Sequence, residues 1–133
     1  MRTFVDTSAL YALLDADDDN HTAAADWFSG SATVAADDLF THNYVLVESA
    51  ALVHHRLGAA GVRDLFDALV PALTVVFVGA AVHERAVAAY LAGLSRRVSF
   101  VDRVSFQLMR DTALDQAFAF DRDFASEGFA LVP

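Results

Sequence analysis

The chain alternates short apolar runs, rich in β-branched and aromatic residues, with longer segments of helical periodicity. Strands are predicted over residues 3–5, 33–36, 73–78, 116–120 and 129–132. Helices are predicted over residues 8–15, 21–29, 41–57, 60–70, 80–93 and 101–112. This alternation indicates βαβ units and a parallel sheet. We therefore expect an α/β fold of three layers (α/β/α), with a central, mainly parallel five-stranded sheet.

The length of the chain favours a single domain over residues 1–133, and no internal repeat or proline-rich linker divides it. No apolar run approaches the roughly 20 residues that span a bilayer, and no segment resembles a signal peptide. We therefore expect a cytoplasmic protein that makes no contact with a membrane.

Missing residue types exclude several chemistries. The sequence has no Cys, which rules out thiol nucleophiles and thiolate metal sites. All nine basic residues are Arg, so the Lys that a P-loop or a Schiff base requires is absent. The pair His83-Glu84 begins like a zinc-binding H-E-x-x-H motif, but Val87 stands where the second His belongs.

The net charge of −9 argues against nucleic-acid binding through overall positive charge. Asp outnumbers Glu fifteen to three. This excess of Asp, together with the lack of Lys, fits either a salt-adapted protein or GC-rich coding.

Two Asp residues end predicted strands. Asp6 follows the first apolar run, Asp121 follows the fourth, and Asp123 comes two residues later. A single Asp here is ordinary helix-capping or turn chemistry. If the first and fourth strands are neighbours, however, Asp6 and Asp121 converge at one edge of the sheet, where open α/β folds place their sites.

Two further acids lie on predicted helices. Glu48 interrupts the run NYVLVESAALV on a mainly apolar face, where a lone carboxylate requires a compensating cation, either an Arg or a metal ion. Asp102 lies three residues after Ser99, which is also the spacing of a helix capping box. Carboxylates that converge favour hard divalent ions such as Mg²⁺ and Mn²⁺, which support phosphodiester hydrolysis.

At these acids the sequence resembles the PIN-domain nucleases, specifically the VapC-type toxins of toxin–antitoxin pairs. The matching segments are FVDTSAL, THNYVLVESAALVHHRLG, SFVDRVSFQLMR and AFAFDRDFASEGFALVP, in the family's order. The resemblance implies a metal-dependent endoribonuclease that uses Mg²⁺ or Mn²⁺ and acts as a toxin. It assigns catalytic and metal-binding roles to Asp6, Glu48, Asp102 and Asp121, with Asp123 as an auxiliary ligand and Ser8 orienting Asp6. It also implies an RNA substrate, a homodimer and a small antitoxin partner.

The arginines in the last third of the chain could bind RNA locally even though the protein as a whole is acidic. Arg96 and Arg97 are candidate substrate-binding residues at the rim of the acidic site, within a set that also includes Arg103, Arg110 and Arg122. Alternatively, these arginines only pair with nearby Asp residues. A non-catalytic PIN-like module that binds protein or RNA, and a PIN nuclease with an RNA-processing role, remain alternative functions.

Overall fold

A central sheet of five parallel strands organises the protein. The computed structural model describes residues 2–30 and 38–133. Within them the strands are β1 (Thr3–Val5), β2 (Leu39–His42), β3 (Thr74–Val76), β4 (Gln116–Phe118) and β5 (Ala130–Val132). Their order is β3-β2-β1-β4-β5, and every neighbouring pair is parallel. This confirms the predicted α/β fold. The first strand also pairs with the fourth, which is the condition under which Asp6 and Asp121 converge.

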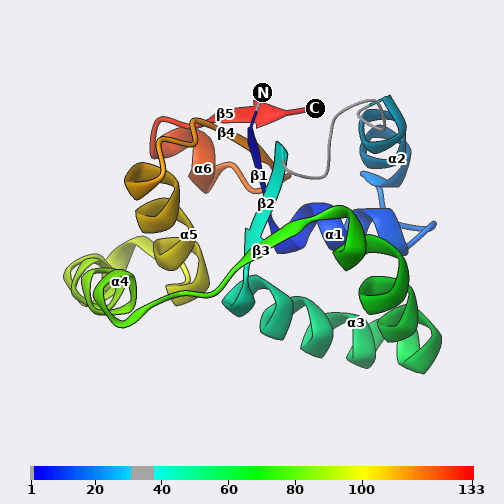
Figure 1. The fold of residues 1–133 in the computed structure, drawn as a ribbon, viewed down its shortest axis with the longest axis horizontal. Helices are drawn as coiled ribbons and strands as arrows, with labels where there is room; N and C mark the ends of the chain where they lie inside the picture. The colour runs from blue at the N-terminus through cyan, green and yellow to red at the C-terminus, as the bar shows by residue number, and fades with distance from the viewer. Residues whose placement is uncertain (1, 31–37) are drawn as a thin grey trace.

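Helices flank the strands on both sides (Figure 1). The helices are α1 (Thr7–Leu14), α2 (His21–Gly30), α3 (Asn43–Asp64), α4 (Ala80–Ala92), α5 (Phe100–Asp111) and α6 (Asp123–Ser126). Short turns of other helix types lie at η3 (Leu65–Leu69), η4 (Val70–Ala72) and η5 (Leu94–Arg96). Figure 1 shows α4, α5 and α6 on one side of the strands, and α1 and α2 on the other. The break predicted between two helices is a kink within α3 at Gly58, whose φ is 74°.

The second strand differs from the prediction. The run at 33–36 lies outside the described residues, and β2 instead extends to His42, although a helix was predicted to begin at residue 41. Two side chains explain why the backbone stays extended. Thr41 Oγ1 donates to the carbonyl of Val5 at 2.9 Å. His42 caps α3, because its Nδ1 accepts from the backbone N–H groups of Tyr44 and Val45.

The core lies around β1 and β4, and it is rich in Phe. Phe4, Phe106, Phe118 and Phe124 are all almost completely buried. Trp27 of α2 packs against Phe118 with ring centroids 4.4 Å apart and so joins α2 to this core. This packing fixes the strand ends from which the site is built. Within the described residues, no helix is long and apolar enough to cross a membrane.

Candidate active site

The carboxyl ends of β1 and β4 open into a cavity of about 330 Å³. Asp6 directly follows β1, and its backbone N–H donates to the carbonyl of Phe118 at the end of β4. The cavity therefore lies at one edge of the sheet, as the strand pairing requires. Its lining residues are Asp6, Thr7, Ser8, Glu48, Leu52, Arg97, Ser99, Asp102, Asp121 and Asp123. The structure thus brings all five predicted carboxylates together.

Asp6 is held from one side and left open on the other. Its Oδ2 accepts from the backbone N–H of Ser8 at 3.1 Å and from Ser8 Oγ at 2.7 Å. Ser8 Oγ also accepts from the backbone N–H of Phe120, which ties α1 to the segment after β4. The other oxygen, Asp6 Oδ1, is buried and has no hydrogen-bond partner among the described residues. Asp6 therefore does cap α1, but it presents a free carboxylate oxygen in the site.

The environment of Asp6 disfavours its charged form. Burial raises the pKa of Asp6 to about 6, and the charges of Glu48 and Asp121 act in the same direction. The two hydrogen bonds from Ser8 oppose this shift. A carboxyl group with such a pKa exchanges its proton near neutral pH, so a cation that binds there competes with a proton.

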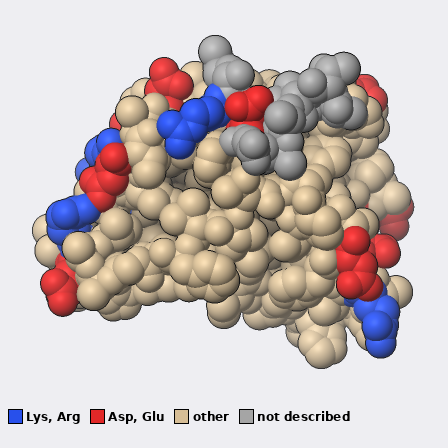
Figure 2. Space-filling model, viewed as in Figure 1, with Lys and Arg blue, Asp and Glu red and all other residues tan. Residues whose placement is uncertain are grey.

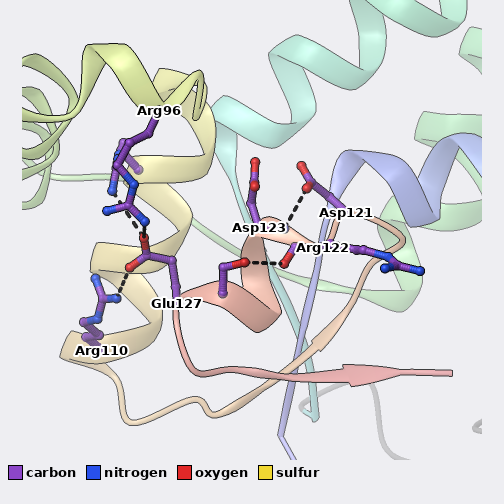
Figure 3. A network of polar contacts seen from close by, with 8 residues as sticks. Arg96, Arg110, Asp121, Arg122, Asp123 and Glu127 are labelled. Atoms are coloured by element: carbon purple, nitrogen blue, oxygen red, sulfur yellow. Dashed lines mark hydrogen bonds and ion pairs between the residues drawn. The ribbon is translucent and has the colours of Figure 1, made fainter.

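Asp102, Asp121 and Asp123 form the tightest group of acids in the described residues. One carboxylate oxygen from each lies within 4.8 Å of the others. Asp121 Oδ1 also accepts from the backbone N–H of Asp123 at 2.9 Å, and the two side chains point the same way (Figure 3). Burial raises the pKa of Asp102, as do the charges of Asp6 and Asp121. Asp123 therefore lies as close to the other acids as the residues predicted to be main ligands.

The helix starts that carry these acids are fixed by local caps. Ser99 caps α5, because its Oγ accepts from the backbone N–H of Asp102 at 3.1 Å. The interpretation of Ser99 as a helix cap is therefore correct. Asp102 lines the cavity as well, so the cap and the predicted site role are compatible. On α3, Ser49 Oγ donates to Thr7 Oγ1 at 3.2 Å and so links the helix that carries Glu48 to α1.

Glu48 is half-buried at the cavity wall. An Arg partner was one explanation for its position on an apolar face, but no arginine pairs with it within residues 2–30 and 38–133. The five carboxylates thus face one another with little compensating charge from the protein. Mg²⁺ and Mn²⁺ prefer oxygen ligands, so this donor set, with the unpartnered Asp6 Oδ1, fits a hard divalent ion.

Comparisons with known proteins place the chain in a family. A sequence model described as the PIN domain matches residues 3–129. The chain belongs to the PIN domain family. It is 37% identical over 131 residues to "23S rRNA-specific endonuclease VapC20" of Mycobacterium tuberculosis, covering 97% of this chain and 96% of the relative. This confirms the resemblance to VapC-type toxins.

Two solved structures share the PIN fold of this chain. The crystal structure of M. tuberculosis VapC20, described as a sarcin-ricin loop cleaving toxin, superposes with a TM-score of 0.85 at 32% identity and covers 96% of each chain. The Pyrobaculum aerophilum protein PAE2754 superposes with a TM-score of 0.65 at 20% identity, covering 99% of this chain and 90% of the other. The second likeness supports the fold alone.

The two candidate substrate-binding arginines of this PIN domain lie in different surroundings. Arg97 lines the cavity and adopts a left-handed backbone conformation with φ 57°. Arg96, its neighbour, instead pairs with Glu127, whereas the alternative interpretation expected pairing with nearby Asp residues. Figure 3 shows Arg122 extending away from Asp121 and Asp123.

Glu127 is the residue that sequence reasoning missed. It follows α6 and pairs with Arg96, Arg103 and Arg110. Its partners lie 17 to 31 residues earlier in the chain, and no local sequence pattern predicts an ion pair over that separation. Its position four residues after Asp123 was the available signal, because residues four apart on a helix share a face.

Proposed function

We propose that this PIN domain is an endoribonuclease that depends on Mg²⁺ or Mn²⁺ and acts as the toxin of a toxin–antitoxin pair. Asp6, Glu48, Asp102, Asp121 and Asp123 hold the metal. The observation that carries the proposal is the unpartnered buried oxygen of Asp6 in a cavity lined by four other carboxylates. The 37% identity with VapC20 along almost the whole chain supports the same activity.

The protein's own groups prepare the site. These carboxylates would hold a divalent ion, which would supply an activated water and stabilisation of the leaving oxygen. Ser8 fixes the orientation of Asp6 through two hydrogen bonds. Ser99 holds the first turn of α5 and so places Asp102 in the cavity. Arg97 lines the same cavity and offers N–H donors to a phosphate group.

We infer that the substrate is a ribosomal RNA stem-loop. VapC20 is named a 23S rRNA-specific endonuclease, and its crystal structure describes it as cleaving the sarcin-ricin loop. This PIN domain covers 96% of that relative with the same fold. A 23S rRNA transcript and intact ribosomes are therefore the first substrates to test. More broadly, we propose that the protein acts in the cytoplasm on RNA.

The exposed apolar side chains support a homodimer. Val47 is 70% exposed and Phe77 is 76% exposed. Val47 also lines, with Tyr44, Glu48 and Val101, an apolar cavity of about 440 Å³ beside the acidic one. Figure 2 shows a broad face with few charged side chains, which gather at its margins. We propose that a second copy covers Val47 and its neighbours, and that a small antitoxin masks the adjoining acidic cavity.

Cleavage of 23S rRNA by the purified chain tests the proposed activity. The reaction is run with Mg²⁺, with Mn²⁺ and with EDTA, and cut sites are mapped by primer extension. Metal-dependent cutting that Asp6→Asn abolishes is the expected result. Asp19→Asn is the matched control, because Asp19 is an exposed acid in the turn before α2 and should leave cutting unchanged.

Absence of cutting by folded, antitoxin-free protein would contradict the nuclease and favour a non-catalytic binding module. Cutting of other cellular RNAs, with 23S rRNA left intact, would contradict the substrate and favour a processing role. The homodimer is tested separately by light scattering after size-exclusion chromatography. Val47→Asp should convert a dimer to a monomer, and a monomeric wild-type chain would contradict this assignment.

A further inference from the structure

Glu127 and its three arginines form a second charged cluster next to the acidic cavity (Figure 3). Arg110 Nη2 lies 2.6 Å from Glu127 Oε2. Arg103 Nη1 and Arg96 Nη2 lie 3.4 Å and 3.5 Å from Glu127 Oε1. We call these four residues the arginine cluster. Its guanidinium groups outnumber its carboxylate by three to one, so the cluster carries two positive charges in excess.

The buried part of the cluster serves as a rigid base. The side chain of Arg103 is only 9% exposed, and that of Glu127 is 14% exposed. Arg103 packs so closely over Gly93 that a Cβ there would come within 2.5 Å of Arg103 Nη2. Burial of both groups fixes the Glu127 carboxylate, and with it the direction of the two remaining arginines.

Arg96 and Arg110 form the exposed part. Their side chains are 60% and 48% exposed. Arg110 is also held over the ring of Phe129, with its Cζ 5.4 Å from the ring centroid. A guanidinium group has five N–H donors, so Arg110 retains donors beyond the one that it directs to Glu127. Arg96 is held to Glu127 by an ion pair and likewise keeps donors for a ligand. Both are held in place while they present those donors to solvent, and a held arginine loses less entropy when it binds.

The cluster adjoins the cavity along the chain. Arg97, which lines the cavity, is the next residue after Arg96. Arg103 directly follows Asp102 on α5, and Glu127 comes four residues after Asp123. Divalent ions held by the carboxylates would offset part of the negative charge of the cavity, and the excess positive charge of the cluster would then be available to another anion.

We propose that Arg96 and Arg110 bind backbone phosphates of the RNA on one side of the cleavage point, with Glu127 and Arg103 holding them in place. The proposal rests on the proposed nuclease function, which supplies a polyanionic substrate at the neighbouring cavity. Arginine suits phosphate because its planar fork makes two parallel hydrogen bonds. In this arrangement the RNA strand runs from the cavity past Arg97 to Arg96, and then to Arg110 on α5.

Salt dependence of RNA binding tests the proposal. The chain carries Asp6→Asn to prevent cleavage, and a labelled stem-loop RNA is titrated at several NaCl concentrations. For single strands, each phosphate contact contributes about 0.7 to the slope of log affinity against log salt. Arg96→Ala and Arg110→Ala should each weaken binding several-fold and reduce that slope by about 0.7, and the double variant should reduce it by about 1.4.

Arg85→Ala is the matched control. The side chain of Arg85 is 52% exposed, which is similar to Arg96 and Arg110. Arg85 forms an ion pair with a single carboxylate, that of Asp111, so this pair has no net positive charge. It should change neither affinity nor slope. Arg110→Lys adds a second control, because it keeps the charge but loses the fork. It should retain the slope while binding more weakly, and melting curves confirm that each variant is folded.

Slopes for Arg96→Ala and Arg110→Ala that equal that of the control would overturn the phosphate site and leave the cluster a purely structural feature. The cleavage assay with native Asp6 keeps the two proposals separable. A chain that cleaves RNA but shows unchanged slopes retains the nuclease and loses the phosphate site. A chain that shows the reduced slopes but never cleaves retains the phosphate site and loses the nuclease.

Discussion

The acidic cavity and the arginine cluster meet on α5, yet charge is arranged in opposite ways in the two. Asp102 and Arg103 are consecutive on α5, and both are largely buried. Burial raises the pKa of Asp102, and the charges of Asp6 and Asp121 raise it further, whereas Arg103 lies against Glu127. The cavity thus concentrates like charges, and the cluster pairs unlike ones.

The repelling charges of the cavity serve function, and the paired charges of the cluster serve stability. Repulsion among the carboxylates destabilises the fold in the absence of a bound cation, so it is tolerated only where cation binding offsets it. The cluster instead ties η5, α5 and the end of α6 together by ion pairs. Substitutions on the two sides of this boundary should therefore change stability in opposite directions.

Asp102→Asn should give the largest effect on activity. It removes a buried ligand from the tightest group of acids, and losing several kcal/mol of metal-dependent stabilisation lowers the rate by about 10³-fold. In EDTA the same change should raise the melting temperature, because one of the mutually repelling charges is gone. Cleavage assays and thermal melts measure both, and a variant that is inactive yet destabilised in EDTA would contradict the repulsion argument.

Glu127→Ala should give the largest loss of stability. It leaves Arg103 buried without its partner, and breaking a buried pair in this way costs about 3 kcal/mol. Urea denaturation measures the change. Asp111→Asn is the control, because it removes the exposed partner of Arg85 and should cost less than about 0.5 kcal/mol. Equal losses in both variants would show that burial of the cluster does not matter.

The same contrast explains which parts of the molecule the sequence could predict. Asp6 and Asp121 follow apolar strands, so the pairing of two strands was enough to bring them together. Glu48 was detectable because a carboxylate interrupts an apolar helical face. Glu127 carries no such local conflict, and its pairing depends on how α5 packs against the end of α6. Long-range ion pairs of this kind arise from tertiary structure and leave no periodicity to detect.

The boundary between β2 and α3 was mispredicted for a related reason. The segment THNY contains polar residues that suit the first turn of a helix, and it was therefore assigned to one. The bond from Thr41 to Val5 and the cap from His42 keep this segment extended until residue 43. The bond from Thr41 depends on Val5, a partner on another strand that the local sequence pattern does not specify. The cap is local, but it makes His42 the residue before the helix and not part of its first turn.

His42→Asn should destabilise the fold by about 1.5 kcal/mol near pH 7, since it loses the bond between His42 Nε2 and Ser105 Oγ. Burial lowers the pKa of His42 to about 4, from an ordinary value of 6.5. Its folded-state pKa is depressed, so its contribution to stability is present above pH 6.5 and is lost as the pH falls towards 4. Denaturation at pH 7 and pH 4.5 should show the gap between wild type and variant narrowing in acid, and a gap that widens would contradict the neutral, buried imidazole.

Metal affinity should rise with pH in the wild type. The pKa of Asp6 is raised to about 6, so in the absence of metal its contribution to stability is greatest in acid and is lost as the pH rises through 6. A bound ion reverses this dependence, because it binds the ionised form. Below pH 6, protonation of Asp6 competes with Mn²⁺ binding. If no other group titrates, the Mn²⁺ affinity should fall about tenfold for each unit by which the pH is lowered. Calorimetric titration measures it, and an affinity that is constant from pH 5 to pH 8 would exclude Asp6 as a ligand.

The smallest effect should come from salt. Molar KCl screens repulsion across a chain of net charge −9 and should raise the melting temperature by a few degrees. The Glu127–Arg103 pair is buried and should be screened little, so Glu127→Ala should show the same rise as the wild type. Asp102→Asn in EDTA should show a smaller rise, because part of the repulsion that salt relieves has already been removed. A melting temperature that does not change with KCl in any of the three proteins would mean that the acidic composition contributes no repulsion that salt can relieve.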